Sequence, residues 1–195
     1  MADAPRKDRL ETRVGFHTAQ GPRPRNEDYV GVHVGTPDQL MRFGAVAVIA
    51  DGVGGAKGGR VAAELAVRCL IEGHLGQNEM LGVRQTSARS IEAINRWLHA
   101  LGRTDGDLEG LSCTLTGLIL RGRQAHVVHV GDTRLYRWRD ERLVRLTTDH
   151  VMGMPPSSRW VMVVGSPGTS TATRRDTACH PNSRRCTSAT GIGPG

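Results

Sequence analysis

The chain has 195 residues, enough for one domain with a substantial core, and carries a formal net charge of +7. Its basic residues are scattered and it has only 3 Trp, 2 Tyr and 2 Phe, which argues against nucleic-acid binding as the main role. Residues 1–13 contain no apolar signal core, no stretch is long enough to cross a bilayer, and the 4 Cys form no Cys-x-x-Cys pair, so we expect a cytoplasmic protein that does not bind membranes.

Hydrophobic periodicity predicts the elements in chain order, after a flexible N-terminus over residues 1–11. Strands are predicted over residues 12–19, 29–34, 43–50, 113–120, 125–130, 134–139 and 142–146, helices over 60–75 and 83–101, and a turn over 35–39. Strands, then two consecutive helices, then further antiparallel strands predict a layered α+β fold. In the last hairpin we expect Tyr136, Trp138, Val144 and Leu146 to share the dry face.

The strand over residues 43–50 is the centre of the pattern, because its apolar run suits a strand buried on both faces. It stops at Asp51, and glycines follow at positions 52, 54 and 55. A buried carboxylate needs a cation or hydrogen bonds, and glycines would let carbonyl oxygens and a phosphate come close. A metal ion is one explanation, and a plain strand, turn and helix with Asp51 as a cap is the other. No Gly-Lys-Ser/Thr follows, so a nucleotide-binding P-loop is excluded.

Acidic residues also occur where other predicted strands meet loops, at Glu27, Asp28 and Asp132. If the strands are neighbours, these carboxylates and Asp51 come together at one end of the sheet. Carboxylates about 5 Å apart repel by a few kcal/mol per pair at an effective dielectric near 20. Divalent cations would remove this repulsion, and ligands that are all oxygen favour Mg²⁺ or Mn²⁺.

Four segments in order resemble the successive motifs of the metal-dependent PP2C-type (PPM) serine/threonine protein phosphatases, most of all the bacterial ones. They are Arg-Pro-Arg-Asn-Glu-Asp at 23–28, Val-Ile-Ala-Asp-Gly-Val-Gly-Gly at 48–55, His-Val-Gly-Asp-Thr-Arg at 129–134 and Leu-Thr-Thr-Asp-His at 146–150. The resemblance covers about residues 12–150. It implies an incomplete α-β-β-α sandwich, in which helix pairs flank two antiparallel sheets.

The resemblance also implies a two-metal site that takes Mn²⁺ or Mg²⁺, with a weaker third metal site. By position, Asp51 bridges both metals and Gly52 offers its backbone carbonyl to one of them. Asp28, and less directly Glu27, hold the metal site. Asp132 matches the ligand of the third metal.

The implied reaction is hydrolysis of phosphoserine or phosphothreonine in proteins by a metal-activated water, with Arg23 binding the substrate phosphate. Phosphorylated proteins and a cognate Ser/Thr kinase are the implied partners. Val53 stands where some relatives have His or Met, so no general acid is evident beside Asp51. After residue 150 the family's later acidic motifs do not follow, and we expect a truncated domain with a disordered or aberrant tail over residues 151–195.

Two further hypotheses stay open at this stage. One is a non-catalytic pseudophosphatase that binds phosphoproteins or a kinase. The other is an unrelated α+β domain whose carboxylates serve as caps and turns.

Overall fold

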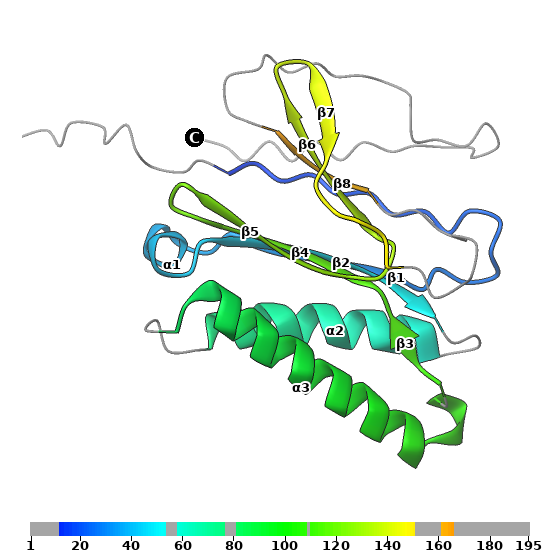
Figure 1. Cartoon of the computed structure of the whole chain (residues 1–195). Coiled ribbons are helices and arrows are strands. Elements are labelled where there is room, and N and C mark those ends of the chain that lie inside the picture. Colours follow the sequence, from blue (N-terminus) through cyan, green and yellow to red (C-terminus); the bar gives the residue numbers. More distant parts are fainter. Residues whose placement is uncertain (1–11, 54–57, 77–80, 109, 151–160, 166–195) are drawn as a thin grey trace, which may run out of the picture.

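The computed structural model describes residues 12–53, 58–76, 81–108, 110–150 and 161–165 (Figure 1). The strands are β1 (Asp28–His33), β2 (Ala45–Val53), β3 (Ser112–Cys113), β4 (Leu115–Arg121), β5 (Gln124–Val130), β6 (Arg134–Arg139), β7 (Arg142–Arg145) and β8 (Val161–Gly165). The helices are α1 (Pro37–Arg42), α2 (Gly58–Leu75) and α3 (Val83–Thr104), with a short 3-10 helix at Gly106–Leu108.

The first sheet has the strand order β1-β2-β4-β5, and all of its neighbouring strands are antiparallel. The short strand β3 pairs with the end of β2. The predicted central strand is confirmed, but β2 runs on through Asp51 to Val53, because Asp51 pairs with Asp28 of β1 and Gly52 pairs with Cys113 of β3. Asp51 therefore lies inside a paired strand rather than in the loop after it.

Both predicted helices are confirmed and pack side by side on one face of the first sheet (Figure 1). Small residues on α2 allow this close packing against alternate residues of β2, because side chains of a strand point to opposite faces in turn. The buried core formed in this way includes Val46, Val48 and Ala50 of β2 and Ala62, Ala63, Ala66, Val67 and Leu70 of α2.

The second sheet lies beyond the opposite face of the first, away from α2 and α3 (Figure 1). Its order is β7-β6-β8, with β6 antiparallel to β7 and parallel to β8. A helix pair on this second sheet, which the resemblance implies, is not found among the described residues. The described part of the sandwich thus has three layers: helices, first sheet and second sheet.

Two local predictions were wrong. Residues 12–19 form no strand in the structure. The predicted turn at 35–39 instead leads into α1, whose start is a capping box: the Thr36 hydroxyl accepts from the Gln39 backbone N–H at 3.3 Å, and the Gln39 side chain accepts from the Thr36 N–H at 2.9 Å. This Thr-x-x-Gln pattern was a signal that could have predicted the helix.

The predicted hairpin of β6 and β7 is confirmed, but the predicted dry face, with Val144 and Leu146 on the side of Tyr136 and Trp138, is wrong. Trp138 lies opposite Leu143, whereas Val144 lies opposite Arg137 and so points to the other face from Trp138. The two-residue turn at Asp140 and Glu141, both with positive φ (49° and 58°), sets this register. A shift of one residue in register exchanges the faces of a whole strand.

The strand β8, with the sequence Val-Met-Val-Val-Gly at Val161–Gly165, lies in the segment 151–195, for which the sequence predicts a disordered or aberrant tail. Residues 151–160 and 166–195 lie outside the described residues, and so does the N-terminus 1–11, so the predictions for both ends stay predictions. Each helix in the described part of the chain is too short or too polar to cross a bilayer.

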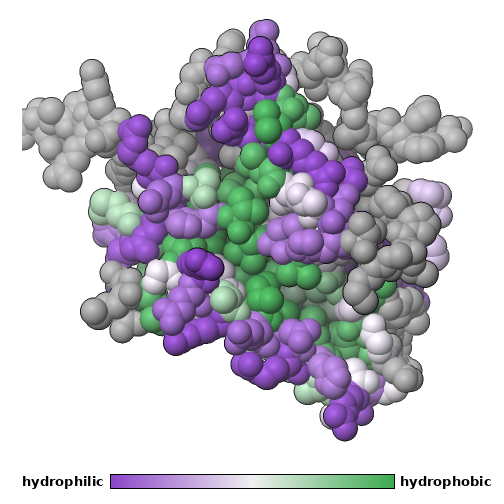
Figure 2. Space-filling model, viewed as in Figure 1, coloured by the Kyte–Doolittle hydropathy of each residue, from purple (hydrophilic) through white to green (hydrophobic). Residues whose placement is uncertain are grey.

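We expect Leu135→Ala to lower the free energy of unfolding by about 3 kcal/mol, because the Leu135 side chain in β6 is fully buried and its loss leaves a cavity. Urea unfolding measures the change. The control is Leu143→Ala in β7, where 52% of the residue is exposed and the expected change is within about 0.5 kcal/mol. Leu143 is one of several exposed apolar residues. Figure 2 shows apolar side chains gathered in the middle of the face of the molecule that it presents. Equal effects of the two substitutions would contradict the packing of β6.

Candidate metal and phosphate site

The acidic residues singled out from the sequence lie at one end of the first sheet. Asp28, at the start of β1, is the direct partner of Asp51, near the end of β2. Direct partners on neighbouring strands project to the same face. Asp132 follows the end of β5, which is the same end of the sheet because β5 is antiparallel to β4. The predicted convergence on one sheet end is therefore present, although β4 separates Asp132 from β2 by two strand spacings, about 10 Å.

The backbone of Asp51 is held firmly. Its N–H donates to the Thr114 hydroxyl at 3.2 Å, and its carbonyl accepts from the Thr114 N–H at 2.8 Å. Gly131 in turn packs against Thr114, where a Cβ on residue 131 would come within 2.6 Å of the Thr114 Cγ2, and its φ of +100° also favours glycine. Thr114 thus ties the ends of β2 and β5 together. The Asp51 residue is only 4% exposed.

Glu27 and Gly52 form a second group on the helix side of the same sheet end. The Gly52 N–H donates to the Glu27 carbonyl at 3.2 Å. A Cβ on Gly59, in the first turn of α2, would lie 2.9 Å from the Glu27 carboxyl carbon and 3.0 Å from the Gly52 carbonyl carbon. The Glu27 carboxylate and the Gly52 carbonyl group therefore flank one small space that only glycine leaves open.

The segment that carries Arg23 is braced by Asn26. The Asn26 side chain accepts from the Asp28 N–H at 3.1 Å and donates to the Thr18 hydroxyl at 2.8 Å, while the Gln20 side chain donates to the Arg23 carbonyl at 2.8 Å. Arg23 is half-buried and lies five residues before Asp28.

Val53 lies at the end of β2, and 55% of the residue is exposed. The glycine-rich residues 54–57 that follow lie outside the described residues.

Arg60 in the first turn of α2 joins the helix to the start of β1. Its guanidinium donates to the Asp28 carbonyl and lies over the Tyr29 ring, 4.7 Å from the ring centroid. The contact places a positive charge beside the backbone of the acidic sheet end. Sequence reasoning assigned no role to Arg60.

The donor chemistry of this sheet end fits Mn²⁺ or Mg²⁺, since carboxylates and a backbone carbonyl supply only oxygen. The number of gathered donors is smaller than expected: among the described residues, no three His, Cys, Asp or Glu side chains form a group that could hold a metal ion. The structure brings Asp28 beside Asp51, and Glu27 beside Gly52. It does not bring Asp132 into either pair.

A cysteine nucleophile is not available at this site. Cys113 of β3 pairs with Gly52, and burial, together with the nearby Asp51 charge, raises the pKa of its thiol to about 12. Its Sγ lies 3.6 Å from the Ala62 carbonyl. The thiolate that a nucleophile requires is therefore disfavoured.

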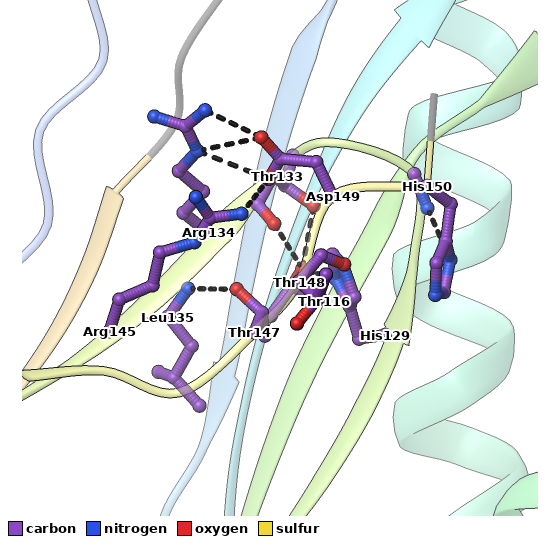
Figure 3. A network of polar contacts seen from close by, with 11 residues as sticks. Thr116, His129, Thr133, Arg134, Leu135, Arg145, Thr147, Thr148, Asp149 and His150 are labelled. Atoms are coloured by element: carbon purple, nitrogen blue, oxygen red, sulfur yellow. Dashed lines mark hydrogen bonds and ion pairs between the residues drawn. The ribbon is translucent and has the colours of Figure 1, made fainter. Parts of the chain in front are cut away.

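A polar network that sequence reasoning missed joins β5 and β6 to residues 147–150 (Figure 3). Its charged centre is Asp149, which accepts hydrogen bonds from Arg134 at 2.5–3.2 Å and from Arg145. The side chains of Arg134 and Asp149 are each 16% exposed. The hydrogen bonds from Arg134, and then the charges of both arginines, hold the pKa of Asp149 below its usual value.

The second part of the network centres on His129 of β5. Its Nδ1 lies 2.8 Å from the hydroxyl of Thr116, its cross-strand partner, and its Nε2 lies 3.0 Å from the Thr148 carbonyl. The Thr116 hydroxyl also lies 2.6 Å from the Thr133 hydroxyl. The His150 ring is 5.0 Å away, between centroids. His129 thus connects the first sheet to the segment that returns from the second (Figure 3).

The contacts of His129 predict a pH dependence. Burial lowers the pKa of His129 below its usual 6.5; the hydrogen bond to Thr148 and the charge of Asp149 oppose this shift, and His150 and Arg145 add to it. Neutral His129 therefore contributes stability above about pH 6.5, which is lost as the pH falls through the folded-state pKa, because the unfolded chain binds the proton more readily. Between about pH 7 and pH 5 we expect His129→Gln to lose less unfolding free energy than the wild type. The exposed His99→Gln should keep the wild-type slope, and a wild-type slope in His129→Gln would contradict the prediction.

Comparison with known proteins agrees with this geometry. A family model described as "Protein phosphatase 2C" matches residues 24–155. The chain is 31% identical over 139 residues to the serine/threonine phosphatase stp of Listeria welshimeri, covering 69% of this chain and 53% of that protein. It is 33% identical over 130 residues to the protein phosphatase PhpP of Streptococcus pneumoniae, covering 66% of this chain and 50% of that one.

Solved structures show the same similarity. The crystal structure of the Mycobacterium tuberculosis serine/threonine phosphatase PstP/Ppp superposes with a TM-score of 0.53 at 33% identity, over 65% of this chain and 49% of that one. The PstP catalytic domain in complex with two manganese ions gives a TM-score of 0.54 at 30% identity, over 67% and 52% of the two chains. The chain spans about half the length of the curated relatives it matches.

Proposed function

Because the chain belongs to the protein phosphatase 2C family, we propose that it removes phosphate from phosphoserine and phosphothreonine in proteins with Mn²⁺ or Mg²⁺. The observation that carries the proposal is the pairing of Asp28 with Asp51, with Glu27 and Gly52 together at the same sheet end. The PstP catalytic domain, one of the structures that this chain resembles, was crystallised with two manganese ions.

In this proposal Asp51 and Asp28 hold the metal pair from the face that they share. The Gly52 carbonyl and the Glu27 carboxylate contribute from the helix side, and Asp132 serves the weaker third site. Bound divalent cations lower the pKa of a water molecule and stabilise charge on the phosphoryl oxygens.

Arg23 binds two phosphate oxygens of the substrate through its guanidinium group, which fixes the phosphate for attack. Val53, at the end of β2, has no proton to donate to the leaving hydroxyl. That proton therefore comes from water or from a group other than Val53. We further propose that the substrates are the products of a cognate Ser/Thr kinase in the cytoplasm.

The test is phosphate release from a phosphothreonine peptide by the purified chain, with Mn²⁺ and with EDTA. We expect release that requires Mn²⁺ and that falls with Arg23→Ala mainly through a higher KM, because Arg23 binds substrate. Arg25→Ala, two residues along the same segment, is the matched control and should keep the wild-type KM. Release that is unchanged by EDTA would contradict the proposed mechanism.

A second candidate function is a non-catalytic module that binds phosphoproteins or a kinase. It is favoured by the finding that no three metal-ligating side chains gather within the described residues. This candidate predicts no phosphate release from a chain that melts cooperatively, together with phosphopeptide binding that Arg23→Ala weakens. Absence of both release and binding would contradict both candidates.

A further inference from the structure

A hollow of about 410 Å³ lies between α2 and α3, on the side of the molecule away from the acidic sheet end. Cys69 and Gly73 line it from α2, and Ser90, Ala93 and Trp97 line it from α3. The Trp97 residue is 49% exposed, so one wall is an accessible aromatic surface. We call this hollow the helix groove.

A buried hydroxyl in the helix groove has no partner. Ser90 is only 6% exposed, and its Oγ makes no hydrogen bond within the described part of the chain. Gly73 lies inside α2 and faces this hydroxyl: a Cβ there would be 2.6 Å from the Ser90 Oγ. The close contact of α2 with α3 therefore covers the hydroxyl, and the accessible lining of the helix groove is mostly apolar.

Two arginines, Arg89 and Arg96, line the helix groove, and Arg103 continues their spacing along α3. Arg89, Arg96 and Arg103 follow one another at intervals of seven residues, all exposed, with Ala93 and Ala100 between them. At 1.5 Å per residue the arginines lie about 10 Å apart along one side of α3. We call these three residues the arginine stripe. In Figure 2 the lower part of the molecule, where α3 lies in Figure 1, is largely hydrophilic.

The acidic residues near the helix groove do not cancel this charge. Glu92 lies 4.0 Å from Arg96, but both side chains are about two-thirds exposed or more, so the pair is weak. Helix α3 carries four arginines, at positions 84, 89, 96 and 103, and Glu92 is its one acidic residue. On α2, Glu72 lies near Cys69 and raises the pKa of that thiol, after the larger effect of burial.

The positive charge of the arginine stripe distinguishes between the possible occupants of the helix groove. The C-terminal part of the chain has a basic excess, with five arginines at 159, 174, 175, 184 and 185 against Asp176, so it would be repelled. A second copy would bring an identical arginine stripe against the first. An acidic partner is the occupant that the surface favours.

We propose that the helix groove and the arginine stripe bind an acidic amphipathic helix of a partner protein. Glutamates at every seventh position of such a helix match the spacing of the arginine stripe. An apolar side chain between them fills the helix groove beside Trp97. Ala93 and Ala100 are small enough to let the partner helix approach to the usual 8–10 Å between axes.

The test measures binding of a labelled 21-residue peptide of Ala, Leu and Glu by fluorescence anisotropy, at low and at physiological salt. The peptide has Glu at every seventh position and Leu on the same face, and a second peptide has the same composition in shuffled order. The protein variants are Arg89→Gln/Arg96→Gln/Arg103→Gln, the matched control Arg137→Gln/Arg139→Gln/Arg142→Gln on the β6–β7 hairpin, and the uncharged change Ala93→Gln.

We expect the wild type to bind the ordered peptide about tenfold more tightly than the shuffled one, and more weakly as salt rises. The arginine-stripe variant should lose about tenfold in affinity and Ala93→Gln should also bind less tightly, while the hairpin variant binds as the wild type does. Equal binding of both peptides, equal loss in the two arginine variants, or an unchanged affinity in Ala93→Gln would each overturn the proposal. Circular dichroism of each variant confirms that α3 is intact.

Discussion

Replacing Asp51 with Asn is expected to abolish the response of the protein to Mn²⁺. Asp51 is 4% exposed, its backbone is fixed by Thr114, and its partner across the sheet is Asp28. The substitution exchanges one carboxylate oxygen for a neutral amide group. Because the site is buried and fixed, neighbouring oxygen donors cannot easily take the place of the lost carboxylate oxygen. Changes at groups that only support metal ligands already cost 10–100-fold in affinity, so loss of a direct ligand should cost at least about 100-fold.

The measurement has two readouts. Phosphate release in the presence of Mn²⁺ should disappear, and so should the rise in melting temperature that Mn²⁺ produces in the wild type by binding the folded state. The matched control is Asp140→Asn, at an exposed turn position with φ of 49° that Asn tolerates well. A variant that keeps the Mn²⁺-induced rise would show that Asp51 is not a metal ligand, whether or not the chain is catalytically active.

Gly52→Ala is expected to destabilise the fold by about 4 kcal/mol or more, which places it among the severe single substitutions. A Cβ on residue 52 would lie 2.0 Å from the Gly59 carbonyl oxygen and 2.2 Å from its carbonyl carbon. Both are backbone atoms in the first turn of α2, so no side-chain rotation can relieve the overlap. The start of α2 would have to move away from β2, and this movement would also take Gly59 away from the Glu27 carboxylate and the Gly52 carbonyl group.

Gly82→Ala is the matched control for this change. Gly82 is the N-cap of α3, its φ is −64°, and no atom lies within 4 Å of an added Cβ. Its effect on the free energy of unfolding should stay within about 0.5 kcal/mol. Thermal unfolding of both variants measures the two changes in the free energy of unfolding. A Gly52→Ala protein as stable as Gly82→Ala would mean that α2 does not approach β2 as closely as the structure places it.

Much of the fold follows from local patterns. The apolar run of β2 and the helical spacing of Val61, Leu65 and Cys69 in α2 and of Ile94 and Leu98 in α3 predict these elements, because hydrophobic burial acts on each segment by its own periodicity. The structure buries a neighbouring stripe of α2 more deeply, with Val67 and Leu70, and leaves Leu65 and Cys69 partly buried. The family follows from four motifs in order. The approach of acidic residues to one sheet end follows from their positions at strand ends, although their roles as metal ligands remain predictions.

Two features were missed although they are local. Val144 faces away from Trp138 because of the register that a two-residue turn sets, and α1 begins at a capping box where only a turn was expected. Other features depend on contacts between residues far apart in the chain. His129 looked like an ordinary strand residue, yet it bonds to Thr116 and Thr148, and Asp149 takes its partner from β6, 15 residues earlier.

The sequence alone therefore determined which segments bury apolar surface and which family the motifs indicate, since both depend on the order of residues along the chain. Only the tertiary structure decided that Glu27 lies with Gly52 on one side of the sheet while Asp28 lies with Asp51 on the other. It also decided that Arg89 and Arg96 of the arginine stripe line the helix groove. The physical reason is that strand register and helix approach are set by packing of the whole domain, which no local pattern specifies.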